Sequence, residues 1–241
     1  MGSDIWCPPT FVGNSGIERF NGIYGFALYF GRLHLGRFTM DAAPSKPDPS
    51  KAEPSKADLR AAALAARDAL GDKKREAAAA KLAKRGLPIE IAAGTVVSGY
   101  SPIRNEIDPA PLMIKLASLG ARLALPVINA RGKSLTFRAW QPNDRLVLGS
   151  LGIPEPSPAA AELVPAIMLV PLAAFDRAGH RIGYGAGYYD HTFAHLRKTH
   201  HVTGVGLAFA AQETLAIPAL SHDVALDFVL TEKDVFDFRS K

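Results

Sequence analysis

The sequence predicts one layered α/β domain over residues 55–241, with a largely parallel sheet flanked by helices. Two observations support this fold class. Apolar strand-like runs alternate with helical patterns along the chain, and one of those runs is apolar throughout. This run, residues 166–175, is typical of a strand that is buried on both faces, as strands of parallel sheets are. No internal boundary is strong enough to divide the domain.

Two helices are expected at the start of the domain. Residues 56–70 are rich in helix formers, and Ser55 with Asp58 makes a capping-box pattern before them. A second helix is predicted over residues 72–86, with Gly86 as its cap. One apolar stripe of the first helix is expected to face the core, and it consists of Leu59, Ala62, Ala63, Ala66 and Leu70.

Strands and helices then alternate to the end of the chain. Helices are predicted over residues 109–120 and 188–200. Strands are predicted over residues 94–100, 122–128, 135–140, 166–175, 202–209 and 227–232. In an open α/β sheet of this kind, ligands bind at the carboxyl ends of the strands.

Residues 1–54 have a different composition and are expected to be a leader and linker. Residues 1–39 show no helical period, and the stretch after Met40 repeats Pro-Ser-Lys three times. Such a composition cannot bury enough apolar surface to offset the entropy of ordering, so disorder is expected. A start of translation at Met40 itself is also an expectation.

The net charge, the cysteine count and the length of the apolar runs limit which partners and compartments are expected. The formal net charge is +5 and the pI about 9.3, which favours anionic partners without choosing among nucleic acid, membrane surface and polyanionic small molecules. The single cysteine, Cys7, excludes an internal disulfide framework and makes the cytoplasm the expected compartment. No apolar run reaches the roughly 18 residues of a membrane span.

The stretch "GYGAGYYD", residues 183–190, predicts an anion site. It follows the most apolar strand-like run and opens a helix, and glycine lets the backbone approach a ligand closely. A tight turn would explain the glycines alone. Arg181 before the loop and Asp190 within it favour phosphate, because arginine can bind phosphate bidentately and aspartate can hold magnesium.

Two further sites for charged chemistry stand out. Lys56 and Arg60 share one face of the first helix near its amino end, where an anion would offset the unfavourable helix dipole. Glu106 follows the predicted strand over residues 94–100, where a carboxylate can accept hydrogen bonds from a heterocycle. A solvated helix face and an exposed loop glutamate are the alternatives.

Together these motifs resemble the 5-formyltetrahydrofolate cyclo-ligase family. The resemblance covers roughly residues 55–235 and is carried chiefly by "FDRAGHRIGYGAGYYD" and "IPALSHDVALDFVLTEK", with "LGSLGIPEP", "NEID" and "SKADLR" adding to it. It implies a Rossmann-like fold of the group that includes CoA-transferases. It also implies the ATP-dependent cyclisation of 5-formyltetrahydrofolate to 5,10-methenyltetrahydrofolate, with release of ADP and phosphate, through a phosphorylated formyl group.

The resemblance also implies a role for each matching position. Arg181, Tyr188 and Tyr189 would be catalytic, while Asp190 and Asp223 would hold Mg2+. The ATP-binding set would be Lys56, Arg60, Arg181, Gly183, Tyr184, Gly185, Ala186, Gly187 and Tyr188. The folate-binding set would be Ser101, Glu106 and Tyr188. Some family members carry arginine and lysine where this chain has Tyr184 and Ala186, so phosphate binding here would depend more on Arg181, Lys56 and backbone N–H groups.

Other classes of function remain open from the residues alone. A catalytically silent nucleotide-binding regulator would keep the same fold, and a nucleic-acid-binding protein would use the basic surface. The second lacks an aromatic–basic recognition motif. His191 and His195 share a helix face but have no HExxH glutamate beside them, so packing is the preferred reading over a zinc site. Small-molecule substrates and a monomer are expected.

Overall fold

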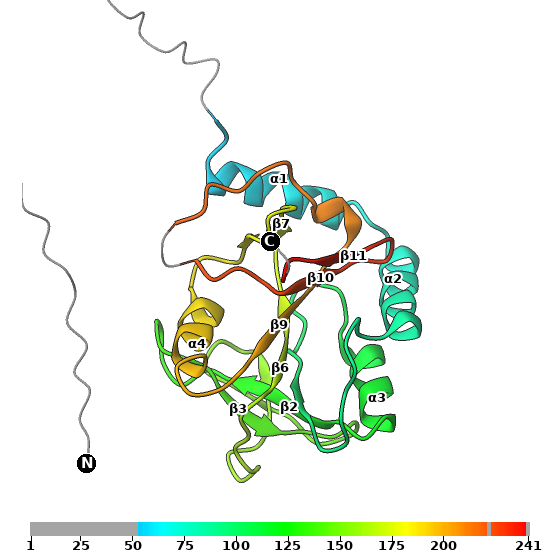
Figure 1. Cartoon of the computed structure of the whole chain (residues 1–241), viewed down its shortest axis with the longest axis vertical. Coiled ribbons are helices and arrows are strands. Elements are labelled where there is room, and N and C mark those ends of the chain that lie inside the picture. The colour runs from blue at the N-terminus through cyan, green and yellow to red at the C-terminus, as the bar shows by residue number, and fades with distance from the viewer. Residues whose placement is uncertain (1–52, 221–222, 240–241) are drawn as a thin grey trace, which may run out of the picture. The chain divides into compact units, whose positions relative to one another are not determined.

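Seven strands form the central sheet in the order β11-β10-β9-β6-β1-β2-β3 (Figure 1). The computed structural model describes residues 53–220 and 223–239. Neighbours among β2, β1, β6, β9 and β10 run parallel, whereas the edge strands β3 and β11 are antiparallel. The prediction of a largely parallel sheet is therefore confirmed. The strands are β1 (Val96–Ser98), β2 (Arg122–Val127), β3 (Thr136–Ala139), β6 (Ile167–Pro171), β9 (Thr203–Leu207), β10 (Phe228–Leu230) and β11 (Val235–Asp237).

Helices cover both faces of the sheet, because alternate residues of each buried strand point to opposite sides. Val97 and Leu169 belong to the cluster packed against α2 and α3, whereas Met168 and Val170 pack with Phe193 of α4. Figure 1 shows α2 and α3 on the opposite side of the sheet from α4. The helices are α1 (Lys56–Asp68), α2 (Asp72–Arg85), α3 (Ala110–Ser118), α4 (Tyr188–Leu196) and the short 3-10 helix η2 (Ala210–Gln212).

The apolar run of residues 166–175 is not one strand, which corrects the sequence prediction. β6 ends at Pro171, which has no N–H to continue the ladder. The chain then forms β7 (Ala174–Phe175), which pairs with β8 (Arg181–Ile182) in a separate hairpin. A second hairpin, β4 (Val147–Leu148) with β5 (Pro154–Glu155), was also not predicted.

The buried face of α1 differs from the predicted apolar stripe. The capping box of Ser55 and Asp58 is present, as expected. Ala63 is buried, but Ala62 is exposed, and Arg67 is 1 % exposed. The inward face therefore carries a cation, because this helix packs over the loops that form the site as well as over the core.

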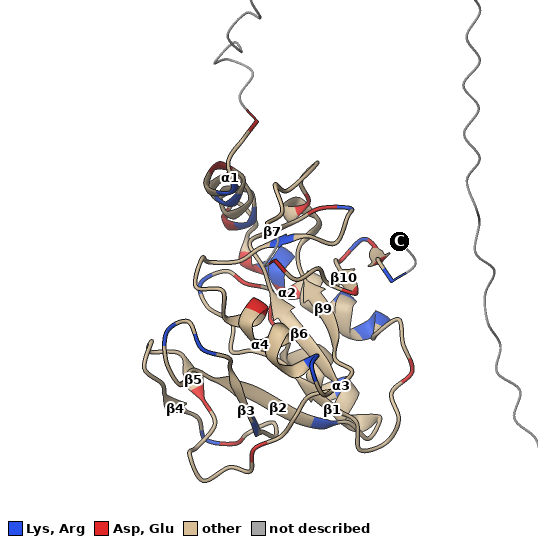
Figure 2. Cartoon of the chain, turned by 60° about the vertical axis from the view of Figure 1, so that its left-hand side comes forward, with Lys and Arg blue, Asp and Glu red and all other residues tan. Residues whose placement is uncertain are grey.

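The predicted leader of residues 1–54 lies outside the described residues except for its last two. The described residues belong to one compact unit. Figure 2 shows charged residues of both signs on the helices and loops around the sheet, whereas the central strands β6 and β9 carry none. Within the described ranges, every helix is too short or too polar to cross a membrane.

Candidate functional site

The site lies where the strand order reverses. β1 pairs with β6 on one side and with β2 on the other, so the loops that follow these strands diverge and leave a crevice at their carboxyl ends. A cavity of about 860 Å³ occupies this position. It is lined by every residue that the sequence predicted for the site, namely Lys56, Arg60, Ser101, Glu106, Arg181, Gly183, Tyr184, Gly185, Ala186, Gly187, Tyr188, Tyr189, Asp190 and Asp223.

The glycine loop, residues 183–187, presents bare backbone to this cavity. Gly185 and Gly187 have φ values of 95° and 66°, a region that side-chain-bearing residues rarely adopt. A Cβ placed on Gly183 would meet nothing within 4 Å. The backbone N–H groups of the loop donate no hydrogen bond to another described residue. Because Gly187 also caps α4, free N–H groups and the helix dipole converge on one anion-binding position.

The β7–β8 hairpin aims Arg181 at this position. The buried carboxylate of Asp176 accepts hydrogen bonds from the backbone N–H groups of Ala178 and His180, at 2.9 Å and 3.0 Å, and so fixes the turn. It also accepts one from the backbone of Ile217 at 3.0 Å. The turn therefore joins the hairpin to the segment that leads to Asp223.

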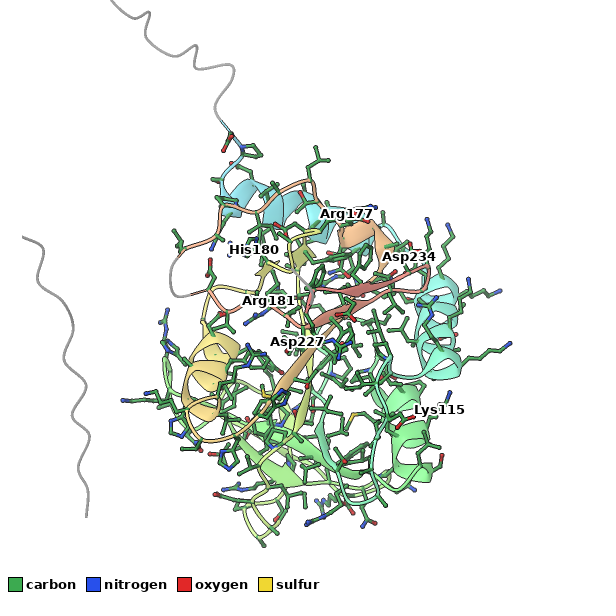
Figure 3. All side chains as sticks on the ribbon, viewed as in Figure 1. Lys115, Arg177, His180, Arg181, Asp227 and Asp234 are labelled. Carbon is green, nitrogen blue, oxygen red and sulfur yellow. The ribbon has the colours of Figure 1, made fainter. Side chains whose placement is uncertain are left out.

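Arg181 connects the hairpin, α4 and the loop before β10 (Figure 3). Its side chain is 5 % exposed, and its Nη2 donates to Oδ1 of Asp190 at 2.7 Å. Its Nη1 donates to the carbonyl of Val224, whose own N–H donates to the same Asp190 oxygen at 3.2 Å. Burial lowers the pKa of Arg181 from its ordinary value, and the charge of Asp190 opposes this effect.

The first turns of α1 bring two more cations to the cavity. Lys56 forms an ion pair with Oδ2 of Asp223, and Arg60 donates from Nε to the carbonyl of Gly183 at 2.8 Å. These contacts contradict the solvated-face alternative for both residues. The face of α1 that carries them thus abuts the glycine loop.

Glu106 brings a carboxylate to the cavity wall, close to the hydroxyl of Tyr184. Its Oε2 accepts a hydrogen bond from the backbone of Ile103 at 2.8 Å, while its buried Oε1 has no partner among the described residues. Burial raises the pKa of Glu106 above its ordinary value, although the hydrogen bond from the Ile103 backbone, the Tyr184 hydroxyl and nearby arginine charges act in the other direction. An unpartnered buried acceptor in a cavity wall is suited to a ligand N–H group.

Tyr184 of the loop and Tyr189 at the start of α4 remain protonated at neutral pH. Burial raises the pKa values of Tyr184 and Tyr189, so both phenols can act as hydrogen-bond donors. The Tyr184 hydroxyl accepts a hydrogen bond from Nη1 of Arg67, and the guanidinium of Arg104 lies 5.7 Å from the Tyr184 ring centre. These contacts attach the loop to α1 and to the Glu106 segment.

Sequence reasoning missed two charged residues at the site. Arg67 lies seven positions after Arg60, so helical spacing would have placed it on the same face two turns later. Glu155 lines the cavity from β5. The motif "LGSLGIPEP" contained it, but no local pattern singled out its carboxylate. The apolar cavity lining was also missed, since only the tertiary fold assembles it: Ile103, Pro126, Ile128, Leu135, Leu151, Ile153, Pro171 and Leu220.

Asp190 and Asp223 bring two carboxylates to the same cavity wall, one on α4 and one in the loop before β10. Arg181 and Val224 occupy only Oδ1 of Asp190. Within the described ranges, no group of three or more histidine, cysteine or acidic side chains could hold a metal ion alone. Two carboxylates suit magnesium that arrives with phosphate oxygens, because Mg2+ keeps few protein ligands in such sites.

Comparisons with known proteins find relatives of one kind. The 5-formyltetrahydrofolate cyclo-ligase of Mycolicibacterium smegmatis is 38% identical over 150 residues, which cover 58% of this chain and 75% of the relative. The Escherichia coli protein of the same name is 31% identical over 148 residues, covering 59% and 80%. The structure of Aquifex aeolicus 5,10-methenyltetrahydrofolate synthetase superposes with a TM-score of 0.63 at 29% identity, over 76% of this chain and 93% of that one.

The relatives and the fold together define an α/β enzyme of the ligase class, and in this chain a glycine loop lies at the switch point of the sheet. The model of the 5-formyltetrahydrofolate cyclo-ligase family matches residues 52–232. The chain belongs to this family. A synthetase from Mycoplasma pneumoniae, at 22% identity and a TM-score of 0.58, shows the same fold.

Proposed function

We propose that this enzyme uses MgATP to cyclise 5-formyltetrahydrofolate to 5,10-methenyltetrahydrofolate, releasing ADP and phosphate. One observation carries the proposal. A single cavity joins a glycine loop with free N–H groups, three cations and the buried carboxylate of Glu106, whose Oε1 accepts no hydrogen bond from the described residues. The first two features suit a polyphosphate, and the last suits the N–H groups of a reduced pterin.

The phosphates of ATP bind between the glycine loop and α1 in this proposal. Backbone N–H groups of residues 183–187 contact the phosphate oxygens, with Tyr184 and Ala186 contributing backbone rather than charge. Lys56, Arg60 and Arg181 supply the positive charge. This division matches a loop that itself contains no lysine or arginine.

Asp190 and Asp223 would hold the magnesium ion that accompanies ATP. Bound there, the ion would neutralise charge on the β- and γ-phosphates. Oδ2 of Asp190 has no hydrogen bond to a described residue, so it can accept a metal directly or through water. The ion pair of Lys56 with Asp223 would then rearrange, leaving Lys56 for the phosphates.

Turnover in this scheme is a phosphoryl transfer followed by ring closure. The formyl oxygen attacks the γ-phosphorus and ADP leaves, giving an imidate phosphate. N10 then attacks the formyl carbon, the carbon–oxygen bond breaks, and phosphate departs with that oxygen while the N10 proton is released to solvent or to the departing phosphate. Such chemistry depends mainly on positioning and charge stabilisation. Arg181 stabilises the charge on the transferring group, and Tyr188 and Tyr189 border the reacting atoms.

The folate is oriented by the segment after β1. Glu106 accepts hydrogen bonds from the substrate through its free Oε1. Ser101 donates its own hydroxyl proton to the carbonyl of Pro154 at 2.6 Å, so it meets the substrate only as an acceptor. Tyr188 lies between the two ligands. We also place the enzyme in the cytoplasm, as a monomer that acts on small molecules and not on nucleic acid, consistent with its single cysteine.

The test follows the near-ultraviolet absorbance of methenyltetrahydrofolate after purified protein is mixed with 5-formyltetrahydrofolate. A rise that requires both ATP and magnesium supports the proposal. ATP binding without any rise would overturn it in favour of a silent nucleotide-binding regulator. Binding to nucleic acid that weakens steeply with salt, again without turnover, would favour the basic-surface alternative.

A further inference from the structure

Glu155 is a buried carboxylate without a charge partner in the cavity wall. The residue is 6 % exposed, and its Oε1 accepts a hydrogen bond from the backbone of Ile128 at 3.1 Å. Its Oε2 has no hydrogen bond, and no lysine, arginine or histidine pairs with it, among residues 53–220 and 223–239. Burying an unpaired carboxylate is costly, so this position is a candidate for ligand recognition.

The surroundings of Glu155 hold the carboxylate in place. It packs so closely against Gly149 that a Cβ there would lie 2.2 Å from the carboxylate carbon. The hydroxyl of Ser101 donates to the carbonyl of Pro154 and thereby ties β5 to the loop after β1. Glu155 is therefore held from three sides: by the β4–β5 turn, by the end of β2 and by the Ser101 loop.

Its place in the sheet separates it from the phosphate side. Ile128 directly follows β2, whereas the chain segment that leads to the glycine loop leaves from the end of β6. β1 lies between these two strands, so their ends are two inter-strand spacings apart, roughly 10 Å. A bicyclic ring whose reacting end lies at the phosphate loop would direct its opposite edge toward Glu155.

We propose that Glu155 recognises the pyrimidinone edge of the folate, accepting hydrogen bonds from its 2-amino group and the adjacent ring N–H. This inference rests on the proposed function. Two neighbouring N–H donors match the acceptors of a carboxylate. Glu106 lies in the loop after β1, the strand that pairs with β6. It would therefore accept hydrogen bonds from the part of the ring that is closer to the reacting atoms. Glu155 is thus a specificity-determining residue and takes no part in phosphoryl transfer.

The test compares Glu155→Gln with wild type in direct binding of 5-formyltetrahydrofolate and, separately, of MgATP. Glutamine keeps an oxygen for the Ile128 N–H and removes the charge. We expect folate affinity to fall about tenfold or more, as for loss of a charged hydrogen bond, with MgATP affinity unchanged and the melting temperature unchanged or raised. Glu76→Gln, on the exposed face of α2, is the matched control and should change neither affinity.

A substrate analogue with methyl in place of the 2-amino group completes a thermodynamic cycle, in which one change is made in the protein and the other in the ligand. Wild type should bind it more weakly than the natural substrate, whereas Glu155→Gln should discriminate little between them. Equal discrimination by both proteins would overturn the inference, as would a parallel loss of folate and MgATP affinity. Because the readout is binding, a wild type that binds folate without turnover would refute the proposed function while the cycle still decides the role of Glu155.

Discussion

Arg67 and Tyr184 are separated by 117 positions in the sequence, yet the guanidinium of one donates a hydrogen bond to the hydroxyl of the other. Arg67 is almost fully buried on α1, and Tyr184 belongs to the glycine loop. Asp68, next to Arg67, accepts a hydrogen bond from the side chain of Asn105 at 3.0 Å, which joins the same helix to the Glu106 segment. One end of α1 therefore holds both the glycine loop and the Glu106 segment in position.

Removal of the Tyr184 hydroxyl should loosen this junction. In Tyr184→Phe, one N–H of a buried guanidinium loses its acceptor, so the free energy of unfolding should fall by about 1–3 kcal/mol. Turnover should fall as well, because the glycine loop keeps its contact with Arg60 but loses its contact with Arg67. Denaturant unfolding and initial rates measure the two effects. In a double-mutant cycle with Arg67→Met, the two changes should be strongly non-additive; simple additivity would contradict the junction.

Gly183 should tolerate a methyl group structurally but not functionally. Its φ lies outside the positive region, and its Cβ position is open, so Gly183→Ala should leave the melting temperature unchanged or slightly raised. The added methyl projects where ATP is proposed to approach, so the KM for ATP should rise several-fold. Gly71→Ala, also at an open position with ordinary φ, is the control. An unchanged KM for ATP would argue against the loop as the phosphate site.

Asp190→Asn should raise the magnesium requirement. The amide oxygen can still accept from Arg181 and Val224, so the fold should lose only about 1–2 kcal/mol. The negative charge proposed to hold magnesium is lost, so the metal concentration for half-maximal rate should increase about tenfold or more. Rates measured across a magnesium titration test this. Asp237→Asn, which affects only a surface pair with Arg239, should leave the titration unchanged; a wild-type curve for Asp190→Asn would refute the metal role.

Glu106 should make both stability and activity depend on pH. Burial raises its pKa above the ordinary value of 4.5, so the folded protein binds more protons than the unfolded chain between that value and the raised one. The free energy of unfolding therefore falls as pH rises through this interval. Glu106→Gln should be more stable than wild type at pH 7, and the difference should vanish below about pH 4.5.

Activity should change with pH in the opposite direction. If the ionised carboxylate accepts substrate hydrogen bonds, kcat/KM for folate in wild type should increase as pH rises through the raised pKa. In Glu106→Gln, kcat/KM for folate should not rise with pH in this way, and turnover should be poor at every pH. The control Glu76→Gln should reproduce the wild-type pH profiles of both stability and activity. If Glu106→Gln showed the wild-type pH profile of stability, Glu106 would not be the group responsible for it.

Much of the site could be predicted from the sequence because its signals are local. The glycine loop, Arg181 and Asp190 lie within ten positions of one another, and the pairing of Lys56 with Arg60 follows from helical spacing. The largely parallel sheet followed from the alternation of apolar runs with helices. These features depend on near neighbours in the chain, so the residues themselves reveal them.

The errors arose where distant segments decide the structure. An apolar run does not show that Pro171 ends one strand and that Ala174 pairs with Ile182 instead. Nor does composition show that α1 would bury Arg67 in preference to Ala62, because the acceptor of Arg67 lies far along the chain. Glu155 was missed for the same reason, since its burial follows from contacts with Gly149 and Ile128.

The ion pair of Lys56 with Asp223 bridges 167 positions of sequence. Asp223, which completes this side of the cavity, therefore leaves the ribosome only when nearly all of the domain has been synthesised. Most strands of the sheet can form before that point. Contacts of such long range close late, because chain entropy opposes them. Catalytic competence therefore marks the end of folding, and a nascent or prematurely terminated chain would assemble a partial sheet without becoming an enzyme.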